Sequence, residues 1–346
     1  MELSQVSQLS GRILDEVERA VIGKRESLTL ILSAVLAGGH VLLEDFPGLG
    51  KTLAARSFAQ TLGLDFKRAQ FTPDLLPGDL TGSFIYDQRA GEFAFRQGPL
   101  FTGLLLADEI NRTPPKTQSA LLEAMQERQV TVEGETFRLE RPFHVLATAN
   151  PVEYEGTYPL PEAQLDRFLM RVSFGYPTAV EELGVLRNRM ARQREEVDLT
   201  TITDSAGLIA MQESIEATTV DDSIAGYCVS LAAASREHAH VLMGASPRGS
   251  LALLLCGRAY AVVKARDYVT PEDIKAVALP VLAHRITVKP ELWMSNVTGR
   301  SVVQSILATV PIPSARERVA DRSASAAPFD ASADQASSPD EGGGPS

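Results

Sequence analysis

A glycine-rich turn followed by lysine and threonine is the segment whose chemistry is easiest to predict. Residues 43–52 read LEDFPGLGKT, between the apolar residues 41–43 and a helix-like segment that begins at Leu53. A phosphate-binding loop requires this order of strand, turn and helix, because successive backbone N–H groups and the positive end of the helix then face the phosphates. The residues expected to bind a nucleoside triphosphate are Pro47, Gly48, Leu49, Gly50, Lys51 and Thr52.

Two side chains of this loop have specific expected roles. The ammonium of Lys51 would reach the β- and γ-phosphates, and the hydroxyl of Thr52 would ligate Mg2+. The loop departs from the strict pattern G-x-x-x-x-G-K-[ST], since Asp45 stands where that pattern has its first glycine. The alternative interpretation is a chance GKT in the loop before a helix.

A second apolar segment, LLLA at residues 104–107, ends in Asp108 and Glu109. At the C-terminal end of a buried strand, Asp108 can hold Mg2+ together with Thr52, and Glu109 can polarise a water molecule. The two segments together are far more specific than either one alone. They predict that the chain hydrolyses a nucleoside triphosphate.

These side chains require a parallel sheet with helices on both faces. Apolar residues at helical spacing predict a helix over residues 4–20 and a second one that ends near residue 36. A strand, a loop and a helix follow over residues 41–62. Further strands are expected at 66–71, 104–107 and 143–147, the last of them ending at Thr148, Ala149 and Asn150. This alternation is typical of an α/β fold.

Two segments interrupt the alternation. Proline and glycine punctuate residues 72–99, where we expect a pair of short strands inserted into the core. An amphipathic helix is expected over 117–128. Residues 129–139 then read as a β-hairpin that turns at Glu133 and Gly134.

The chain changes character after Pro177, where long helical patterns begin. Thr270 is the expected N-cap of one helix, with Pro271 at its first position and Asp273 three residues after the cap. The helices are expected over residues 179–194, 204–217, 222–240, 248–265 and 271–284. The predicted organisation is an αβα core over 1–176, an all-helical domain over 177–310, and a disordered tail over 311–346 that has too few apolar residues to fold.

Composition narrows the possible functions. A length of 346 residues favours two domains, and the net charge of −11 disfavours a broad nucleic-acid footprint. Cys228 and Cys256 lack metal-site spacing and favour buried thiols in a reducing compartment, with a disulfide as the alternative. The first residues lack the pattern of a signal peptide, and the apolar tract over 28–43 is interrupted by Gly38-Gly39-His40. We expect a cytoplasmic protein without a membrane span.

The sequence resembles the MoxR subfamily of AAA+ ATPases from about residue 5 to residue 310. The resemblance implies a P-loop NTPase core followed by a smaller all-α lid domain, with ATP and Mg2+ as ligands. The segments that carry it occur in the family's order: EDFPGLGKT (44–52), QFTPDLLPGDLTG (70–82), GPLF (98–101), LLLADEINR (104–112), LLEAMQERQVT (121–131), ATANP (147–151), PLPEAQLDRF (159–168) and GASPR (244–248).

The resemblance assigns roles to two residues of the core. Asn150 matches the polar residue that positions the attacking water, although an Asn before a proline also fits a turn cap. Arg167 matches the arginine that family members project into the neighbouring subunit's site. There it would neutralise charge that develops on the γ-phosphate. The alternative for Arg167 is a local ion pair with Asp166.

Two further assignments come from the resemblance. Arg248 matches a second sensor that would reach from the lid domain to the γ-phosphate, with a solvated first-turn arginine as the alternative. Val21, Ile22 and Gly23 occupy the place where the family packs the adenine ring, although an apolar pair before glycine is common in any core. The histidines are expected to be structural, so Mg2+ is the only metal predicted.

An arginine that acts in a neighbouring subunit requires assembly, so we expect a homo-oligomeric ring, with six as the predicted number of subunits. The resemblance implies a chaperone-like motor that remodels or activates a protein complex. Relatives are associated with partners that carry a von Willebrand factor A domain, often in the insertion of a cofactor or metal. The inserts at 72–99 and 129–139 would face the ring pore or one ring face, or be ordinary surface hairpins.

Two other functions stay open. One is a helicase-like DNA motor, which the hairpin disfavours because Glu133 and Glu135 outweigh Arg138. The other is a slow nucleotide-dependent switch, which has little need for both Glu109 and Arg167.

Overall fold

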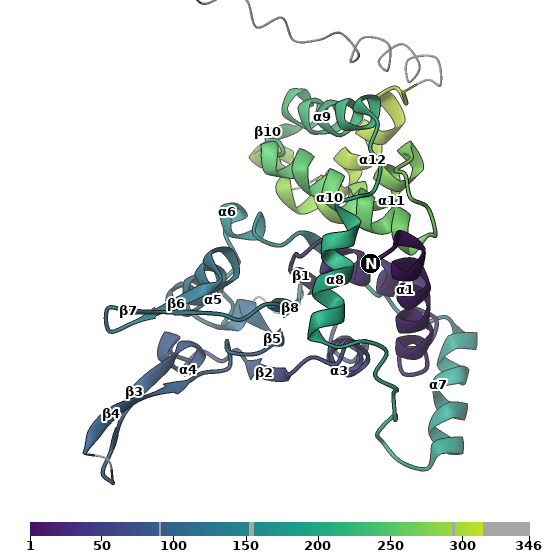
Figure 1. Ribbon diagram of the computed structural model, residues 1–346. Coiled ribbons are helices and arrows are strands. Elements are labelled where there is room, and N and C mark those ends of the chain that lie inside the picture. The colour runs from purple at the N-terminus through teal and green to yellow at the C-terminus, as the bar shows by residue number, and fades with distance from the viewer. Residues whose placement is uncertain (90, 152–155, 293–294, 314–346) are drawn as a thin grey trace, which may run out of the picture.

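The computed structural model describes residues 1–89, 91–151, 156–292 and 295–313. A five-stranded sheet in the order β2-β5-β8-β1-β9 forms its centre, and every neighbouring pair of strands is parallel (Figure 1). Its strands are β1 (Val41–Glu44), β2 (Phe66–Gln70), β5 (Leu104–Asp108), β8 (His144–Ala149) and β9 (Met170–Val172). The expectation of an α/β core is confirmed, with β9 as an additional edge strand.

The sheet is covered on both faces because its strands alternate in the direction of their side chains. Leu104 and Leu106 join the apolar cluster of α1 (Leu3–Glu18), α2 (Arg25–Leu36) and α3 (Lys51–Thr61). Leu105 and Ala107 join a second cluster with α5 (Pro115–Glu127). Strands β5 and β8 are buried along their whole length, which explains their continuous apolar sequence.

Both predicted hairpins are present and extend from the same side of the core (Figure 1). Strands β3 (Gly82–Asp87) and β4 (Glu92–Gln97) pair antiparallel after a short helix, α4 (Pro77–Thr81), that the sequence did not predict. Strands β6 (Gln129–Val132) and β7 (Glu135–Arg138) form the second hairpin. Phe95 and Phe137 stack with ring centroids 4.0 Å apart, so aromatic packing joins the two hairpins at their bases.

The lid contains α9 (Asp222–Glu237), α10 (Pro247–Val263), α11 (Pro271–Leu282) and α12 (Gly299–Thr309). It is not purely helical, because β10 (Val241–Met243) and β11 (Thr287–Val288) form a short antiparallel pair. The predicted start of α11 is confirmed: the Asp273 backbone N–H donates to the Thr270 hydroxyl, and the Thr270 N–H donates to the Asp273 carboxylate.

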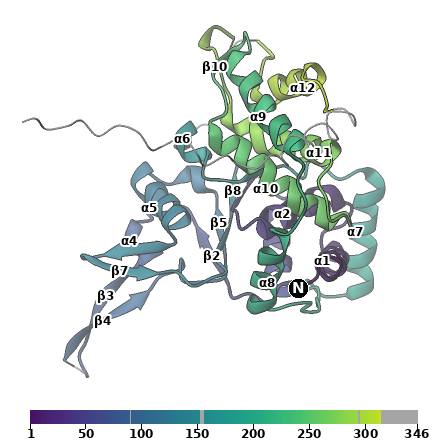
Figure 2. The ribbon, with the colours of Figure 1, turned by 45° about the horizontal axis from the view of Figure 1, so that its top comes forward.

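Two helices assigned by sequence to the second domain lie against the core instead. Helix α8 (Ser205–Ile215) packs against α1 and α2 as well as against α10. Helix α7 (Ala179–Arg192) lies beside α1 in both views, and Lys24 Nζ is 3.9 Å from the Glu181 carboxylate (Figures 1 and 2). The predicted boundary at residue 177 between the αβα core and the all-helical domain stays a prediction.

Three smaller expectations can be compared with the structure. Cys228 and Cys256 are buried free thiols, so the disulfide alternative is not realised, and burial raises the pKa of each thiol to about 12. Across the described ranges, no helix has both the length and the apolar character needed to cross a bilayer. The predicted disordered tail lies outside the described residues, apart from its first three positions.

Candidate active site

The glycine-rich loop connects the end of β1 to the start of α3. Gly48 and Gly50 have positive φ angles of 81° and 83°, a conformation that side chains with a Cβ rarely adopt. Open space lies within 4 Å of both positions, and Gly50 is the N-cap of α3. The loop thus has the backbone turn and the unobstructed surface that a phosphate group needs at a helix N-terminus.

Lys51 points back over this loop. Its Nζ donates to the backbone oxygen of Asp45 at 2.6 Å and lies 3.4 Å from that of Ala149. Burial lowers the pKa of the Lys51 ammonium, and the carboxylates of Asp45, Asp108 and Glu109 oppose that shift. These contacts place the ammonium between the loop and the end of β8, where phosphate oxygens could replace the carbonyl acceptors.

Asp45, the departure from the strict loop pattern, has a structural explanation. Its carboxylate is buried and accepts from the Ser173 hydroxyl at 2.6 Å and from the Phe174 and Gly175 backbone N–H groups at 2.5 and 3.2 Å. A glycine could accept none of these hydrogen bonds. Asp45 therefore fixes the start of the loop to the segment that follows β9.

Asp108 and Glu109 lie at the end of β5, on the same edge of the sheet. The Thr148 hydroxyl donates to Asp108 Oδ1 at 2.6 Å and accepts from the Glu109 backbone N–H at 2.8 Å. Arg68 donates to Asp108 Oδ2 at 2.7 Å. The Glu109 carboxylate accepts from Gln70 at 2.8 Å and from Arg112 at 3.1 Å.

The donor set at this edge fits Mg2+, which prefers carboxylate and hydroxyl oxygens and keeps phosphate and water ligands. Asp108 supplies a carboxylate that Thr148 orients, and Thr52 is exposed in the first turn of α3. Arg68 occupies one oxygen of Asp108, so it would have to share that oxygen with the cation.

Sequence reasoning missed Arg68, Gln70 and Thr148. The sequence does contain a signal for these residues. Arg68 and Gln70 alternate at the end of a predicted strand, and Thr148 lies in the segment 147–151 that also contains Asn150. The sequence does not indicate which strands are neighbours in the sheet. The order β2-β5-β8 places these three side chains on either side of Asp108 and Glu109.

Asn150 follows β8 and is buried beside these residues. Its backbone oxygen accepts from the Asn111 side chain at 3.2 Å, and the preceding residue, Ala149, approaches Lys51. The structure therefore brings Asn150 to the edge of the sheet that carries the loop, Asp108 and Glu109.

The segment proposed for adenine lies next to α7. Val21 is buried, whereas Gly23 is exposed and so close to Glu181 that a Cβ there would stand 2.2 Å from the Glu181 carboxylate. Lys24 donates to the Tyr176 backbone oxygen at 3.1 Å. Tyr176 in turn lies 5.7 Å from the ring of Phe46 in the loop. Both rings are exposed, and neither was singled out from the sequence.

Arg167 and Arg248 lie elsewhere. Leu169 N–H donates to the His40 oxygen at 2.8 Å, so the segment that contains Arg167 lies at the start of β1, whereas the loop follows the end of β1. Arg248 Nη1 is 4.0 Å from Asp166. Arg248 therefore lies beside the segment that contains Arg167, and its expected reach from the lid to a γ-phosphate stays a prediction.

The alternative of an Asp166–Arg167 ion pair is not realised. Asp166 pairs with Arg285 at 2.7 Å. Among the described residues, the half-buried Arg167 side chain forms neither a hydrogen bond nor an ion pair.

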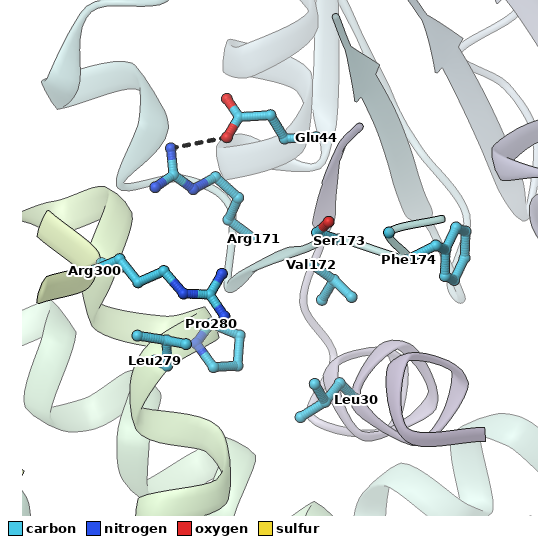
Figure 3. Close-up of a pocket in the computed structure, with 11 residues that line it drawn as sticks. Leu30, Glu44, Arg171, Val172, Ser173, Phe174, Leu279, Pro280 and Arg300 are labelled. Atoms are coloured by element: carbon cyan, nitrogen blue, oxygen red, sulfur yellow. Dashed lines mark ion pairs between the residues drawn. The ribbon is translucent and has the colours of Figure 1, made fainter. Parts of the chain in front are cut away.

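A cavity of 320 Å³ opens between the core and the lid (Figure 3). Its core side includes Ser173, Phe174 and the ion pair of Arg171 with Glu44 at 3.2 Å. Its lid side is formed by Leu279, Pro280, Ala283 and Arg300. The cavity therefore borders the segment that holds Asp45, although residues 48–52 do not line it.

Comparison with known proteins gives matches along most of the chain. Residues 40–170 match the ATPase family associated with various cellular activities, and residues 233–306 match the AAA lid domain. The uncharacterized protein YeaC of Bacillus subtilis is 48% identical over 90% of this chain and 97% of its own length. Chaperone MoxR1 of Mycobacterium tuberculosis is 40% identical over 87% of this chain and 82% of its own.

A solved structure is similar to this chain over most of its length. The crystal structure of a candidate ATPase from Cytophaga hutchinsonii superposes with a TM-score of 0.84 at 42% identity, over 90% of this chain and 97% of that one.

Proposed function

The chain belongs to the MoxR-type AAA+ ATPases, and from this premise we propose that it is an ATP-hydrolysing, ring-forming motor that remodels or activates a partner protein complex. The proposal includes Mg2+ as the companion of the nucleotide and six subunits in the ring. We propose that its partner protein carries a von Willebrand factor A domain.

The positions of the site residues along the strands support the proposed ring. Lys51, Asp108 and Glu109 lie at the end of the parallel strands, whereas Arg167 and Arg248 lie at their start. The four residues of β1 separate these two edges by about 13 Å, at 3.3 Å per residue. A γ-phosphate bound over the loop would therefore obtain its arginines from another copy. We assign both arginines to the neighbouring subunit's site.

Each residue then has a defined task. Lys51 and the backbone N–H groups of the loop hold the phosphates, and Thr52 and Asp108 would hold Mg2+, which neutralises phosphate charge when it is bound. Glu109 polarises the attacking water, and Asn150 orients it. Arg167 and Arg248 of the adjacent copy stabilise the charge of the transition state, where such an arginine contributes on the order of 10³–10⁵ in rate.

Val21, Ile22 and Gly23 support an adenine site in this proposal. The next residue, Lys24, donates to the backbone oxygen of Tyr176, whose ring approaches Phe46 of the phosphate-binding loop. An adenine ring could pack against this exposed aromatic pair and Ile22 while its phosphates lie over Gly48 and Gly50.

The two hairpins are the proposed output of the motor. They extend from the core away from the lid, and the Tyr86 and Phe93 rings lie 5.3 Å apart while both are more than half exposed (Figure 1). Exposed aromatic groups of this kind often mark protein-binding surfaces. Motion of the core could therefore be transmitted to a client protein at this face.

The test is the steady-state ATPase rate against protein concentration for wild type, Glu109→Gln, Arg167→Ala and an equimolar mixture of the two variants. Activity per subunit should rise as rings form, and each variant alone should be nearly inactive. In the mixture, about a quarter of the interfaces pair an intact Glu109 with an intact Arg167, so activity should return.

Turnover that does not depend on concentration, together with an Arg167→Ala variant near the wild-type rate, would overturn the shared site. Undetectable turnover in assembled rings would instead favour a nucleotide-dependent switch. Salt-dependent binding of single-stranded DNA would favour the DNA motor.

A further inference from the structure

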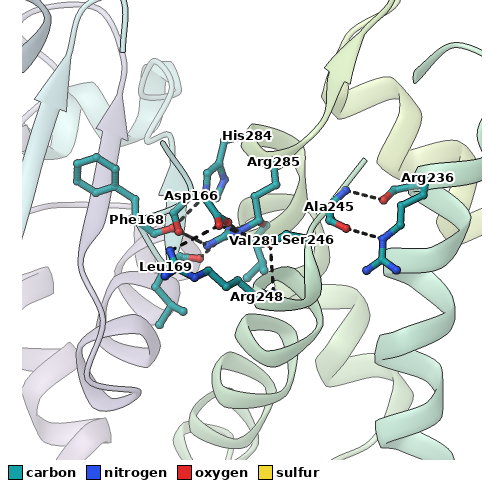
Figure 4. Close-up of polar contacts among 11 residues, drawn as sticks. Asp166, Phe168, Leu169, Arg236, Ala245, Ser246, Arg248, Val281, His284 and Arg285 are labelled. Carbon is teal, nitrogen blue, oxygen red and sulfur yellow. Dashed lines mark hydrogen bonds and ion pairs between the residues drawn. The ribbon is translucent and has the colours of Figure 1, made fainter. Parts of the chain in front are cut away.

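Asp166, which immediately precedes Arg167, is held by three residues of the lid (Figure 4). Its Oδ1 accepts from Arg285 Nε at 2.7 Å. Its Oδ2 lies 3.5 Å from the hydroxyl of Ser246 and 4.0 Å from Nη1 of Arg248. The residue next to the proposed trans arginine is therefore one of the points where the lid is attached to the core.

Arg285 makes the strongest of these contacts. Its guanidinium, only 3% exposed, also donates to backbone oxygens of the core, to Phe168 at 2.8 Å, Asp166 at 3.2 Å and Leu169 at 3.3 Å. A further hydrogen bond joins it to the Val281 oxygen of α11, in the lid. One side chain thus binds three of the four residues from Asp166 to Leu169.

The charges around Arg285 favour this attachment. Burial lowers the pKa of the Arg285 guanidinium, while Asp166 opposes that shift. His284, whose Nε2 is 3.1 Å from the Phe168 oxygen, is buried beside it. Burial and the Arg285 charge lower the pKa of His284 well below its usual range, so the imidazole is neutral and adds no positive charge beside Arg285. The charge of Arg248, which also faces Asp166, lowers the pKa of Arg285 further.

We propose that Arg285 is the positioning residue for the trans arginines: it joins the lid to the segment 166–169, so that Arg167 of the core and Arg248 of the lid are presented to the neighbouring subunit as one rigid unit. The inference rests on the proposed function, because it requires that Arg167 acts in trans. By occupying Asp166, Arg285 also keeps that carboxylate from pairing with Arg167.

The planar guanidinium is needed because it donates in several fixed directions at once. A lysine keeps the positive charge but cannot reproduce four or more directed hydrogen bonds. The Arg285→Lys variant should therefore retain a charged partner for Asp166 and lose the bonds to Phe168 and Leu169. A displacement of Arg167 by about 1 Å would lower the rate on the order of 10²-fold.

The defect should appear on one side of each subunit interface only. Arg285→Lys should be nearly inactive alone, because no subunit presents Arg167 correctly. Mixed with Glu109→Gln it should recover activity, since its own loop, Asp108 and Glu109 are intact and the Glu109→Gln subunit supplies a well-placed Arg167. Mixed with Arg167→Ala it should stay inactive, because both variants fail on the same side.

The full-length protein is used throughout, with ring assembly checked by sedimentation velocity and ATPase activity as the readout. Arg258→Lys is the matched control, because this lid arginine pairs with Glu216 at 2.6 Å rather than with residues 166–169. It should keep the wild-type rate. Asp166→Asn is the second variant and should reproduce the defect on the arginine side of the interface. It tests the positioning role if Arg285→Lys does not fold.

The outcomes separate this inference from the proposed function. If Arg167→Ala and Glu109→Gln fail to complement each other, the trans site itself is overturned. If that pair complements while assembled Arg285→Lys or Asp166→Asn keeps the wild-type rate, the positioning role is overturned. The same holds if either variant assembles but recovers no activity with Glu109→Gln, because its defect is then not confined to the arginine side.

Discussion

At the scale of single residues, Asp45 shows how a departure from a sequence pattern can be a structural contact. The strict loop pattern has glycine there, but in this fold the carboxylate accepts three hydrogen bonds from residues 173–175. Removing it would leave buried N–H groups without an acceptor, and each such loss costs about 1–3 kcal/mol.

Asp45→Gly is therefore predicted to lower the free energy of unfolding and to weaken ATP binding, although it restores the strict pattern. Thermal unfolding with and without nucleotide measures both effects. Asp74→Gly, at an exposed carboxylate, is the control and should leave the midpoint close to the wild-type value. An Asp45→Gly protein as stable as wild type would contradict this explanation.

Arg68 gives a second prediction at this scale. Its guanidinium bonds the Asp108 oxygen that a cation would use. Arg68→Gln should therefore lower the Mg2+ concentration for half-maximal ATPase activity by about two- to fivefold, the range expected for a partly exposed ion pair. Titration of the rate with Mg2+ tests this, with Lys67→Gln on the same strand as the control. An unchanged or higher requirement would mean that the two do not compete.

At the scale of elements, α7 differs from the other described helices of ten or more residues, because none of its 14 residues is buried. Val180, Leu183, Leu186 and Met190 recur at intervals of three or four residues and are all exposed, so they form an apolar stripe along one face. An isolated helix of this length is only marginally stable in water. The stripe is thus a candidate for contact with a neighbouring subunit in the proposed ring, beside the nucleotide site.

Replacing Leu183 and Met190 by serine should weaken ring assembly while the unfolding midpoint of the monomer changes little, since neither side chain contributes to the core. Sedimentation velocity over a range of protein concentrations measures the assembly. Val229→Ser, at an exposed position of α9, is the control for lost apolar surface. If both proteins assemble like wild type, the stripe has another role.

At the scale of the whole molecule, buried histidines connect the elements. His40 lies between α5 and β8, accepting from the Val145 N–H at 3.0 Å and contacting the Met125 oxygen at 3.1 Å. His144 joins β8 to Gly39 at 2.9 Å and to Gln212 of α8 at 3.0 Å. Burial lowers the pKa of His40 to about 3 and that of His144 to about 4.

These shifts predict acid sensitivity. The unfolded chain binds protons at histidine below about pH 6.5, whereas the folded chain does so only near its much lower pKa values. The stabilising contribution is therefore complete above about pH 6.5 and is lost as the pH falls toward 4, by about 1.4 kcal/mol per pH unit for each histidine. Chemical denaturation at pH 7.5 and 5.5 measures the loss.

A His144→Gln protein serves as the comparison, since it should be less stable overall but should lose less stability over the same pH interval. An equal pH dependence in the two proteins would show that His144 titrates normally.

Features that depend on neighbours along the chain could be predicted from the order of the amino acids. The loop at 47–52, the strand that ends in Asp108 and Glu109, the hairpins and the Thr270 cap follow from local spacing and from the backbone preferences of glycine, proline and threonine, and the structure contains them. The α/β core and its family could be predicted for the same reason, because the characteristic segments are contiguous.

Contacts between residues far apart in the sequence could not be predicted in this way. The strand order brings Arg68 and Gln70 to Asp108 and Glu109, and the parallel pairing of β1 with β9 places Arg167 at the opposite edge from Lys51. The bonds from Arg285 to residues 166–169 span more than 115 positions of the chain. Such contacts depend on how strands are ordered and how the lid packs, and no local pattern of residues encodes that arrangement.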